Sequence, residues 1–112
     1  MFTLPNTHSL TKNKQHLPAA ATAAIASVTV PDDEYAVIDW VWYSYSAAPT
    51  GGNLKIDLGG TVLVDVDITA AGPGFVSFGN QPLTDATKGS DITVTLASGG
   101  GAIVGSLQIG YR

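Results

Sequence analysis

The fold class follows from residues 53–69, NLKIDLGGTVLVDVDIT, in which apolar and polar residues alternate on both sides of a glycine pair. An extended chain with this period of two has its apolar residues on one face, as in a half-buried β-strand. The apolar set of the second run is Val62, Val64, Val66 and Ile68. Gly59 and Gly60 can take the positive φ angles of a tight turn. We therefore predict a β-hairpin with one buried face.

The same alternation recurs elsewhere in the chain. The further runs are residues 26–30, 91–96 and 103–111. Residues 70–90 are rich in turn formers around one short run at 75–78. About seven or eight strands without a convincing amphipathic helix predict an all-β fold, an antiparallel β-sandwich of jelly-roll type.

Residues 35–46 differ, because both faces of the expected strand are apolar or aromatic. One face carries Tyr35, Val37, Val41, Tyr43 and Tyr45, and the other carries Ile38, Trp40 and Trp42. A strand covered on both sides is either ordinary core with another segment packed outside it, or an interface with a subunit or ligand. Both interpretations stay open at this point. The candidate partner-binding residues of the strand are Trp40, Trp42, Tyr43 and Tyr45.

The chain divides into two regions of different composition. Residues 1–24 contain Lys12, Lys14 and two prolines but no acid, whereas residues 25–112 carry all nine carboxylates. We predict an extended N-terminal arm over 1–24 and a β-sandwich domain over 25–112. We also expect residues 3–18 to be disordered in the isolated protein and ordered on a partner. Lys12 and Lys14 are candidate contacts with an acidic partner surface, and a solvated tail is the alternative.

Composition excludes several classes of partner. The net charge is −4 and the acids lie outside the basic arm, so we expect no binding of nucleic acid. No apolar run approaches the roughly 20 residues that span a membrane, and the alanine-rich stretch near the N-terminus makes a poor secretory signal. We therefore expect a soluble protein made in the cytoplasm. Only 12% of residues are charged, which leaves weakly polar surface for association and predicts a homo-oligomer, a dimer or trimer.

The sequence contains no recognisable catalytic or metal-binding constellation. His8 and His16 lie in the arm, with no nucleophile or carboxylate arranged beside them. Asp65 and Asp67 share an exposed strand face and lack the unequal environments that glycoside hydrolysis requires. The acids at 32–34 lack the ligand spacing of a calcium loop, so a calcium site is only a minor alternative to a solvated turn. We expect no enzyme, no cofactor and no metal, and stacking of a sugar on exposed rings stays open.

The layout of the chain resembles a known family. It combines a cysteine-free chain of 112 residues, an N-terminal arm, and the late strands SDITVTL (90–96) and IVGSLQIGY (103–111). In this it looks like the small jelly-roll decoration, or cement, proteins of tailed-phage capsids. The resemblance implies a non-enzymatic virion structural protein on the capsid surface, which binds the major capsid protein and stabilises contacts between its subunits. The alternative is a carbohydrate-binding or receptor-binding β-sandwich module of a phage fibre or tail.

Overall fold

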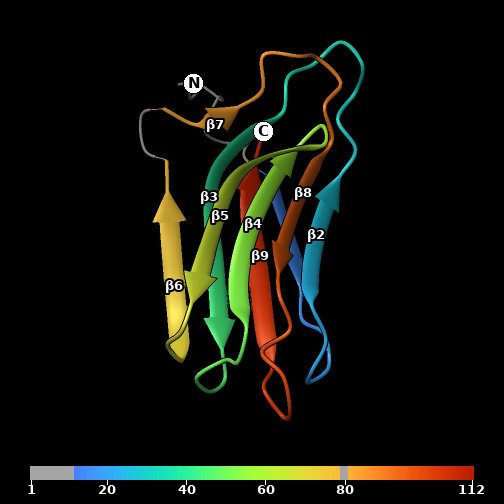
Figure 1. Cartoon of the computed structure of the whole chain (residues 1–112). Helices are drawn as coiled ribbons and strands as arrows, with labels where there is room; N and C mark the ends of the chain where they lie inside the picture. Colours follow the sequence, from blue (N-terminus) through green and yellow to red (C-terminus); the bar gives the residue numbers. More distant parts are fainter. Residues whose placement is uncertain (1–11, 79–80) are drawn as a thin grey trace, which may run out of the picture.

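The computed structural model describes residues 12–78 and 81–112, which form two layers of β-strands (Figure 1). The strands are β1 (Lys12–His16), β2 (Ala24–Val28), β3 (Val37–Tyr45), β4 (Gly52–Leu58), β5 (Thr61–Ile68), β6 (Gly72–Ser77), β7 (Leu83–Thr84), β8 (Ile92–Leu96) and β9 (Gly105–Tyr111). Sheet A has the order β1-β9-β3-β6, with β7 also paired to β3, and sheet B has the order β2-β8-β4-β5. Every pairing is antiparallel. The predicted all-β sandwich is confirmed, and the described residues include no helix able to cross a bilayer.

The two sheets pack their apolar faces against each other. On β4 and β8 every second side chain is buried, as the alternation predicts. The largest fully buried residues are Tyr45, Ile38, Leu54, Ile56, Leu58, Ile92, Leu96, Leu107, Ile109, Val41 and Val94. Full burial of one such aliphatic side chain contributes about 1.5–3 kcal/mol. The core shared by the two sheets therefore holds the sandwich together.

The predicted hairpin is β4–β5, and its outer strand is less buried than expected. Its turn glycines Gly59 and Gly60 have φ angles of 63° and 90°. A bulge between the pairs Ile56–Val64 and Asp57–Val62 leaves Leu63 without an opposite residue. On this strand at the edge of sheet B, Val62 is 49% exposed and Val66 is 51% exposed. The predicted buried face on residues 61–69 is therefore discontinuous: Ile68 is buried and Val64 packs half-buried against the core, whereas Val62 and Val66 are exposed.

A second bulge changes the faces of β3. Ile38 pairs with Tyr111 and Trp40 pairs with Gly110, so Asp39 is an extra residue between them. An extra residue breaks the period of two, so Ile38 and Trp40, although two residues apart, point to opposite faces of the sheet. Ile38, which the alternation placed beside Trp40, is instead fully buried in the core. Trp40 stays on the outer face.

Part of the predicted arm belongs to sheet A. Residues 12–16 form β1, which pairs along its whole length with β9. At its end the backbone N–H of Ile25 on β2 donates to His16 Nδ1 at 2.9 Å, which links β1 to the other sheet. The polar sequence KNKQH gave no strand signal, because an edge strand buries little side-chain surface. Over 12–16 the chain is a strand rather than a free extension, and the rest of the predicted disordered segment up to residue 11 lies outside the described residues.

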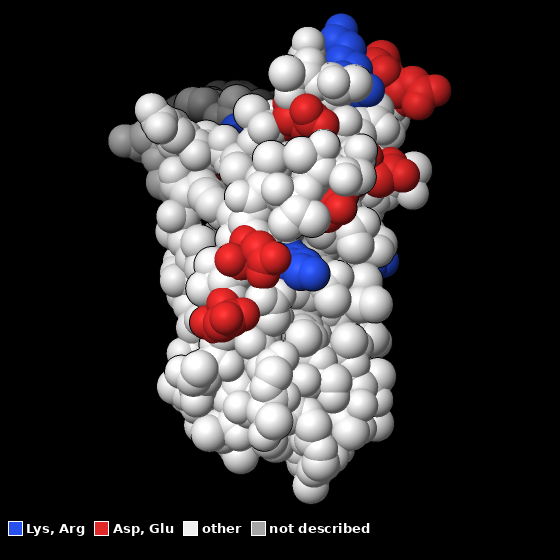
Figure 2. Space-filling view, viewed as in Figure 1, with Lys and Arg blue, Asp and Glu red and all other residues white. Residues whose placement is uncertain are grey.

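Charge is distributed unevenly along the sandwich (Figure 2). Four connections lie at one end, residues 17–23, 46–51, 69–71 and 97–104, and none of them contains a charged residue. In Figure 2 this end is uniformly white, whereas acidic and basic side chains occupy the middle and the opposite end. The opposite end includes the acids at 32–34 and Asp85, Lys88 and Asp91. The two ends of the molecule therefore offer different environments to a ligand.

Candidate functional site

Three aromatic rings lie side by side on the outer face of sheet A. Trp40 and Trp42 are two residues apart on β3, with the fully buried Val41 between them pointing into the core. Phe75 on the neighbouring β6 lies opposite Trp42 and is 61% exposed. The rings of Trp40 and Phe75 have centroids 5.9 Å apart and planes inclined by 31°. We call these three residues the aromatic face.

A glycine on the next strand makes room for the first indole. Gly110 on β9 lies opposite Trp40. A Cβ atom at Gly110 would come within 2.3 Å of the indole atoms Cε2 and Nε1 of Trp40. The ring therefore lies directly over the glycine backbone. Any side chain at this position would displace it.

Strand register continues the aromatic face into two uncharged rows that cross four strands. The row through Trp42 reads Gln15, Gln108, Trp42 and Phe75, from β1 to β6. The row through Trp40 reads Asn13, Gly110, Trp40 and Ser77. Amide side chains thus stand beside aromatic rings on the same face. Rings with a few adjacent polar groups and no charge suit a neutral ligand that has both apolar faces and hydroxyl groups.

Tyr43 and Tyr45, also predicted to bind a partner, lie on the other side of β3. Tyr45 is only 1% exposed, and its hydroxyl donates to the carbonyl oxygen of Ala97 at 2.6 Å. Burial is the main cause of the raised pKa of Tyr45. Tyr43 packs against the core with its ring over Gly74. Tyr45 therefore presents no surface to a partner, and neither residue belongs to the aromatic face.

The two candidate lysines are also separate from the tryptophans. Lys12 and Lys14 are exposed on β1, opposite Tyr111 and Ile109. Ile109 of sheet A is fully buried in the core between the two sheets. Paired residues point to the same side of a sheet, so the lysines lie on the side of β1 that faces away from the aromatic face. The structure brings Trp40 and Trp42 together with Phe75, and leaves Lys12 and Lys14 outside the group.

The acidic residues do not form a metal-binding group in residues 12–78 and 81–112. Asp65 and Asp67 lie on the outer face of sheet B, where Asn53 Nδ2 donates to both carboxylates at 2.7 and 3.1 Å. His16 Nδ1 accepts a hydrogen bond from the backbone N–H of Ile25, so this bond involves no nucleophilic side chain. Across this part of the chain, no three side chains of His, Cys, Asp or Glu are grouped to hold a metal ion.

The sequence analysis missed Phe75 and the amides as site residues. A short run at 75–78 was expected within a turn-rich segment, but β6 begins already at Gly72, and nothing local indicated that Phe75 would lie beside the tryptophans. Gln108 and Gln15 alternate correctly in their strands but carry no signal of their own. Only the pairing of β9 with both β1 and β3 makes them neighbours of Trp42.

Comparison with known proteins gives a fold but no family. No family model matches the chain, and no curated protein matches it. A solved structure of the carbohydrate-binding module CBM36, in complex with calcium and xylotriose, is similar with a TM-score of 0.52 and 17% sequence identity. This likeness covers 88% of the chain described here and 76% of the module. It supports the jelly-roll form of the β-sandwich.

A second solved structure matches less well. It is an exo-β-1,3-galactanase from Phanerochaete chrysosporium with β-1,3-galactotriose, with a TM-score of 0.35 and 12% identity, covering 92% of this chain and 28% of the enzyme. The resemblance to phage decoration proteins stays a prediction from the sequence.

Proposed function

We propose that this protein is a non-enzymatic carbohydrate-binding β-sandwich that holds a neutral glycan against the aromatic face. The observation that carries the proposal is the group of Trp40, Trp42 and Phe75 in two uncharged rows of sheet A, beside glutamine side chains. The C–H faces of a sugar ring pack on aromatic rings without needing charge. The amides of Gln15 and Gln108 can donate to and accept from the sugar hydroxyls.

The fold is compatible with this function. The module CBM36, whose structure contains xylotriose, has a similar β-sandwich. At 17% identity the likeness concerns the fold, so the proposed site rests on the residues of this chain alone. A β-sandwich fold by itself hosts many functions, and the aromatic face is what favours a glycan.

The expected affinity is modest. Stacking on one ring adds about 0.5–1.5 kcal/mol beyond the burial of its area. An open sheet surface covers only one side of a ligand, whereas a deep pocket encloses most of it. We therefore expect dissociation constants in the millimolar to micromolar range, about −4 to −8 kcal/mol.

Affinity electrophoresis in gels that contain neutral polysaccharides (xylan, mixed-linkage β-glucan, β-1,3-galactan) tests the proposal. The wild-type protein should be retarded by at least one polymer, and Phe75→Ala and Trp42→Ala should migrate as in a gel without polymer. Phe75 is the cleaner target because its 61% exposure means that little core packing is lost. Ile25→Ala is the matched control, since Ile25 is an apolar residue 47% exposed on the outer face of sheet B. Retardation of Phe75→Ala and Trp42→Ala equal to that of the wild type would refute the proposal.

A protein partner is the second candidate, and a different surface favours it. Val62, Leu63 and Val66 on the edge strand β5 are between 43% and 51% exposed. Exposed apolar residues on a free strand edge are typical of sites that another chain covers. This surface is compatible with the predicted clamp on the major capsid protein of a virion, and with the predicted homo-oligomer.

Sedimentation separates these possibilities. In the capsid interpretation, the protein co-sediments with phage shells, and Val66→Lys abolishes the association while Ile25→Lys does not. In the oligomer interpretation, sedimentation equilibrium of the protein alone gives a dimer or trimer at micromolar concentration. Sedimentation as a monomer in the presence of shells would exclude both protein partners.

A further inference from the structure

Sheet A carries a cavity on the same outer face, beyond the tryptophans. The cavity has a volume of about 640 Å³ and lies where β7 and the end of the chain meet the start of β3. Its walls include Tyr35, Val37, Thr84, Asp85 and Arg112. Val37 pairs with Thr84 of β7, and the backbone N–H of Arg112 donates to the carbonyl oxygen of Val37 at 3.0 Å. These contacts hold three separate segments around one hollow.

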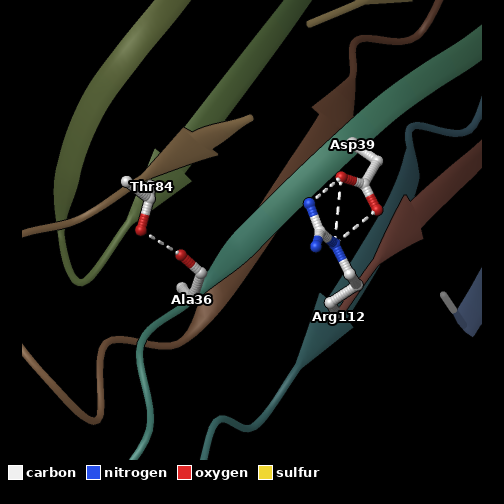
Figure 3. Close-up of polar contacts among 4 residues, drawn as sticks. All are labelled: Ala36, Asp39, Thr84 and Arg112. Carbon is white, nitrogen blue, oxygen red and sulfur yellow. Dashed lines mark hydrogen bonds and ion pairs between the residues drawn. The ribbon is translucent and has the colours of Figure 1, made fainter. Parts of the chain in front are cut away.

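The cavity lies further along β3 from the aromatic face, on the same side of sheet A. Arg112 follows Gly110 by two residues, so it projects to the face on which Trp40 lies. Its guanidinium group forms three hydrogen bonds of 2.9–3.2 Å with the carboxylate of Asp39, the residue of the β3 bulge (Figure 3). Arg112 is therefore both a wall of the cavity and the ion-pair partner of Asp39, the residue before Trp40. From Trp42 to Val37 the strand spans about 16 Å, a length that suits several sugar rings.

The groups in the cavity match those of a sugar-binding subsite. Tyr35 is 48% exposed and offers a ring to the hollow, while the Lys88 ammonium lies 5.5 Å from the centre of that ring. Thr84 Oγ1 donates to the carbonyl oxygen of Ala36 at 2.7 Å, which orients this wall (Figure 3). One ring and polar groups of both kinds, acceptor and donor, thus surround the same space.

The charge around the cavity disfavours an acidic ligand. The Asp85 carboxylate accepts from Ser90 Oγ at 2.7 Å and from the backbone N–H of Thr87 at 3.2 Å. These hydrogen bonds lower the pKa of Asp85, so it is ionised at neutral pH. Two positive charges lie at the cavity: Arg112, which is offset by Asp39, and Lys88, whose ammonium lies 5.5 Å from the centre of the Tyr35 ring. The adjoining loop, whose Glu34 carbonyl accepts from the backbone N–H of Gly89 at 2.8 Å, adds Asp32, Asp33 and Glu34.

We propose that this cavity is a second subsite for the same neutral glycan, in which Tyr35 stacks on a sugar ring, Asp85 accepts from its hydroxyls and Arg112 donates to them. The proposal rests on the proposed function, because the chain of sugars reaches the cavity from the aromatic face. With the second subsite, the protein binds long, neutral oligosaccharides more tightly than short or acidic ones.

Calorimetric titration with xylotriose and xylohexaose tests the second subsite. If another polymer in the gels retards the protein more strongly than xylan does, the three-unit and six-unit oligosaccharides of that polymer replace xylotriose and xylohexaose. The wild-type protein should bind the hexasaccharide about tenfold more tightly than the trisaccharide. Tyr35→Ala should reduce the hexasaccharide affinity to that of the trisaccharide and leave the trisaccharide affinity unchanged. Tyr35→Phe should bind both as the wild type does, because it keeps the ring.

The outcomes separate the subsite from the proposed function. If Phe75→Ala and Trp42→Ala lose binding while Tyr35→Ala binds the hexasaccharide as the wild type does, the second subsite is wrong and the proposed function stands. If Phe75→Ala and Trp42→Ala also bind as the wild type does, or no sugar binds, the proposed function fails and the subsite fails with it. Hexagalacturonate supplies the charge control, and binding as tight as that of the neutral hexasaccharide would overturn the assignment to a neutral ligand. Thermal unfolding of each variant confirms that the fold is retained.

Discussion

The outer faces of sheet A and sheet B follow the same strand alternation but carry different chemistry. Sheet A presents Trp40, Trp42 and Phe75 among amides and glycine. The middle of sheet B presents Asn53, Lys55, Asp65, Asp67, Thr93 and Thr95. A polar, charged face is typical of a sheet surface exposed to water, whereas clustered apolar rings on a surface are typical of a binding site. The difference teaches that strands with the same alternation can present a charged face on one sheet and clustered rings on the other, and the rings are the basis of the proposed glycan site.

The largest effect should separate the two faces at once. Trp40→Ala removes a ring that packs on Gly110 and Phe75, so we expect a loss of about 2–3 kcal/mol in the free energy of unfolding together with loss of glycan binding. Lys55→Ala on sheet B should stay within about 0.5 kcal/mol and bind as the wild type does. Urea denaturation and affinity electrophoresis measure both quantities. Equal effects of the two substitutions would remove the distinction between the faces.

Gly110 offers a way to disturb the aromatic face without touching an aromatic residue. Gly110→Ala places a Cβ where the Trp40 indole now lies, so the ring must move. We expect a destabilisation of about 1–3 kcal/mol from overpacking, and weaker glycan binding. The measurements are again denaturation and gel retardation. Unchanged binding in a folded Gly110→Ala protein would mean that the position of the Trp40 ring is not important for the ligand.

Tyr45→Phe tests whether the inner face of β3 is separate from the outer one. The substitution removes the hydroxyl that donates to Ala97 and accepts from the backbone N–H of Asn53. The carbonyl oxygen loses its donor, so we expect a cost of about 1–2 kcal/mol in unfolding free energy. Glycan affinity should not change, because Tyr45 points into the core. A fall in affinity greater than twofold at constant temperature would contradict this separation.

Asn53→Ala examines the polar face alone. Asn53 Nδ2 is hydrogen-bonded to both Asp65 and Asp67, and its removal leaves two carboxylates of like charge on one strand face. We expect a destabilisation of about 0.5 kcal/mol that shrinks as salt is added, since exposed charges are screened. Denaturation at low and high ionic strength provides the measurement. A cost that is independent of salt would rule out repulsion between the two aspartates as its cause.

The smallest effect concerns pH at the charged end. The hydrogen bond from Ser90 is the first cause of the lowered pKa of Asp85, whose ordinary value is 3.8. A carboxylate with a lowered pKa contributes stability above its unfolded-state pKa, and this contribution is lost as the pH falls through the folded-state pKa. Ser90→Ala should therefore weaken the pH dependence of the melting temperature below about pH 4. A pH profile identical to that of the wild type would exclude the Ser90 bond as the source of the shift.

The local elements of the fold could be predicted from the sequence. Alternation over residues 53–69 and 91–96 identified the strands, and Gly59-Gly60 identified the turn, because the period of two is a property of neighbouring residues. The aromatic residues of β3 were also recognised as candidates, and Trp40 and Trp42 prove to lie on the surface. The polar strand β1 was missed because an edge strand needs little apolar surface.

The residues of the site came together only through the tertiary structure. Phe75 and Gln108 are 33 residues apart in the numbering of the chain, yet each pairs with Trp42 from opposite sides. Which strands pair is decided by hydrogen bonds and burial over the whole sandwich, and no local pattern contains that information. The bulge at Asp39 directs Ile38 into the core. The polar strand β1 pairs with β9 at the edge of sheet A. Alternation by itself determined that this protein is a β-sandwich with an aromatic strand. The order of the strands decided that the aromatic residues form one surface, because side chains become neighbours across a sheet only when their backbones pair.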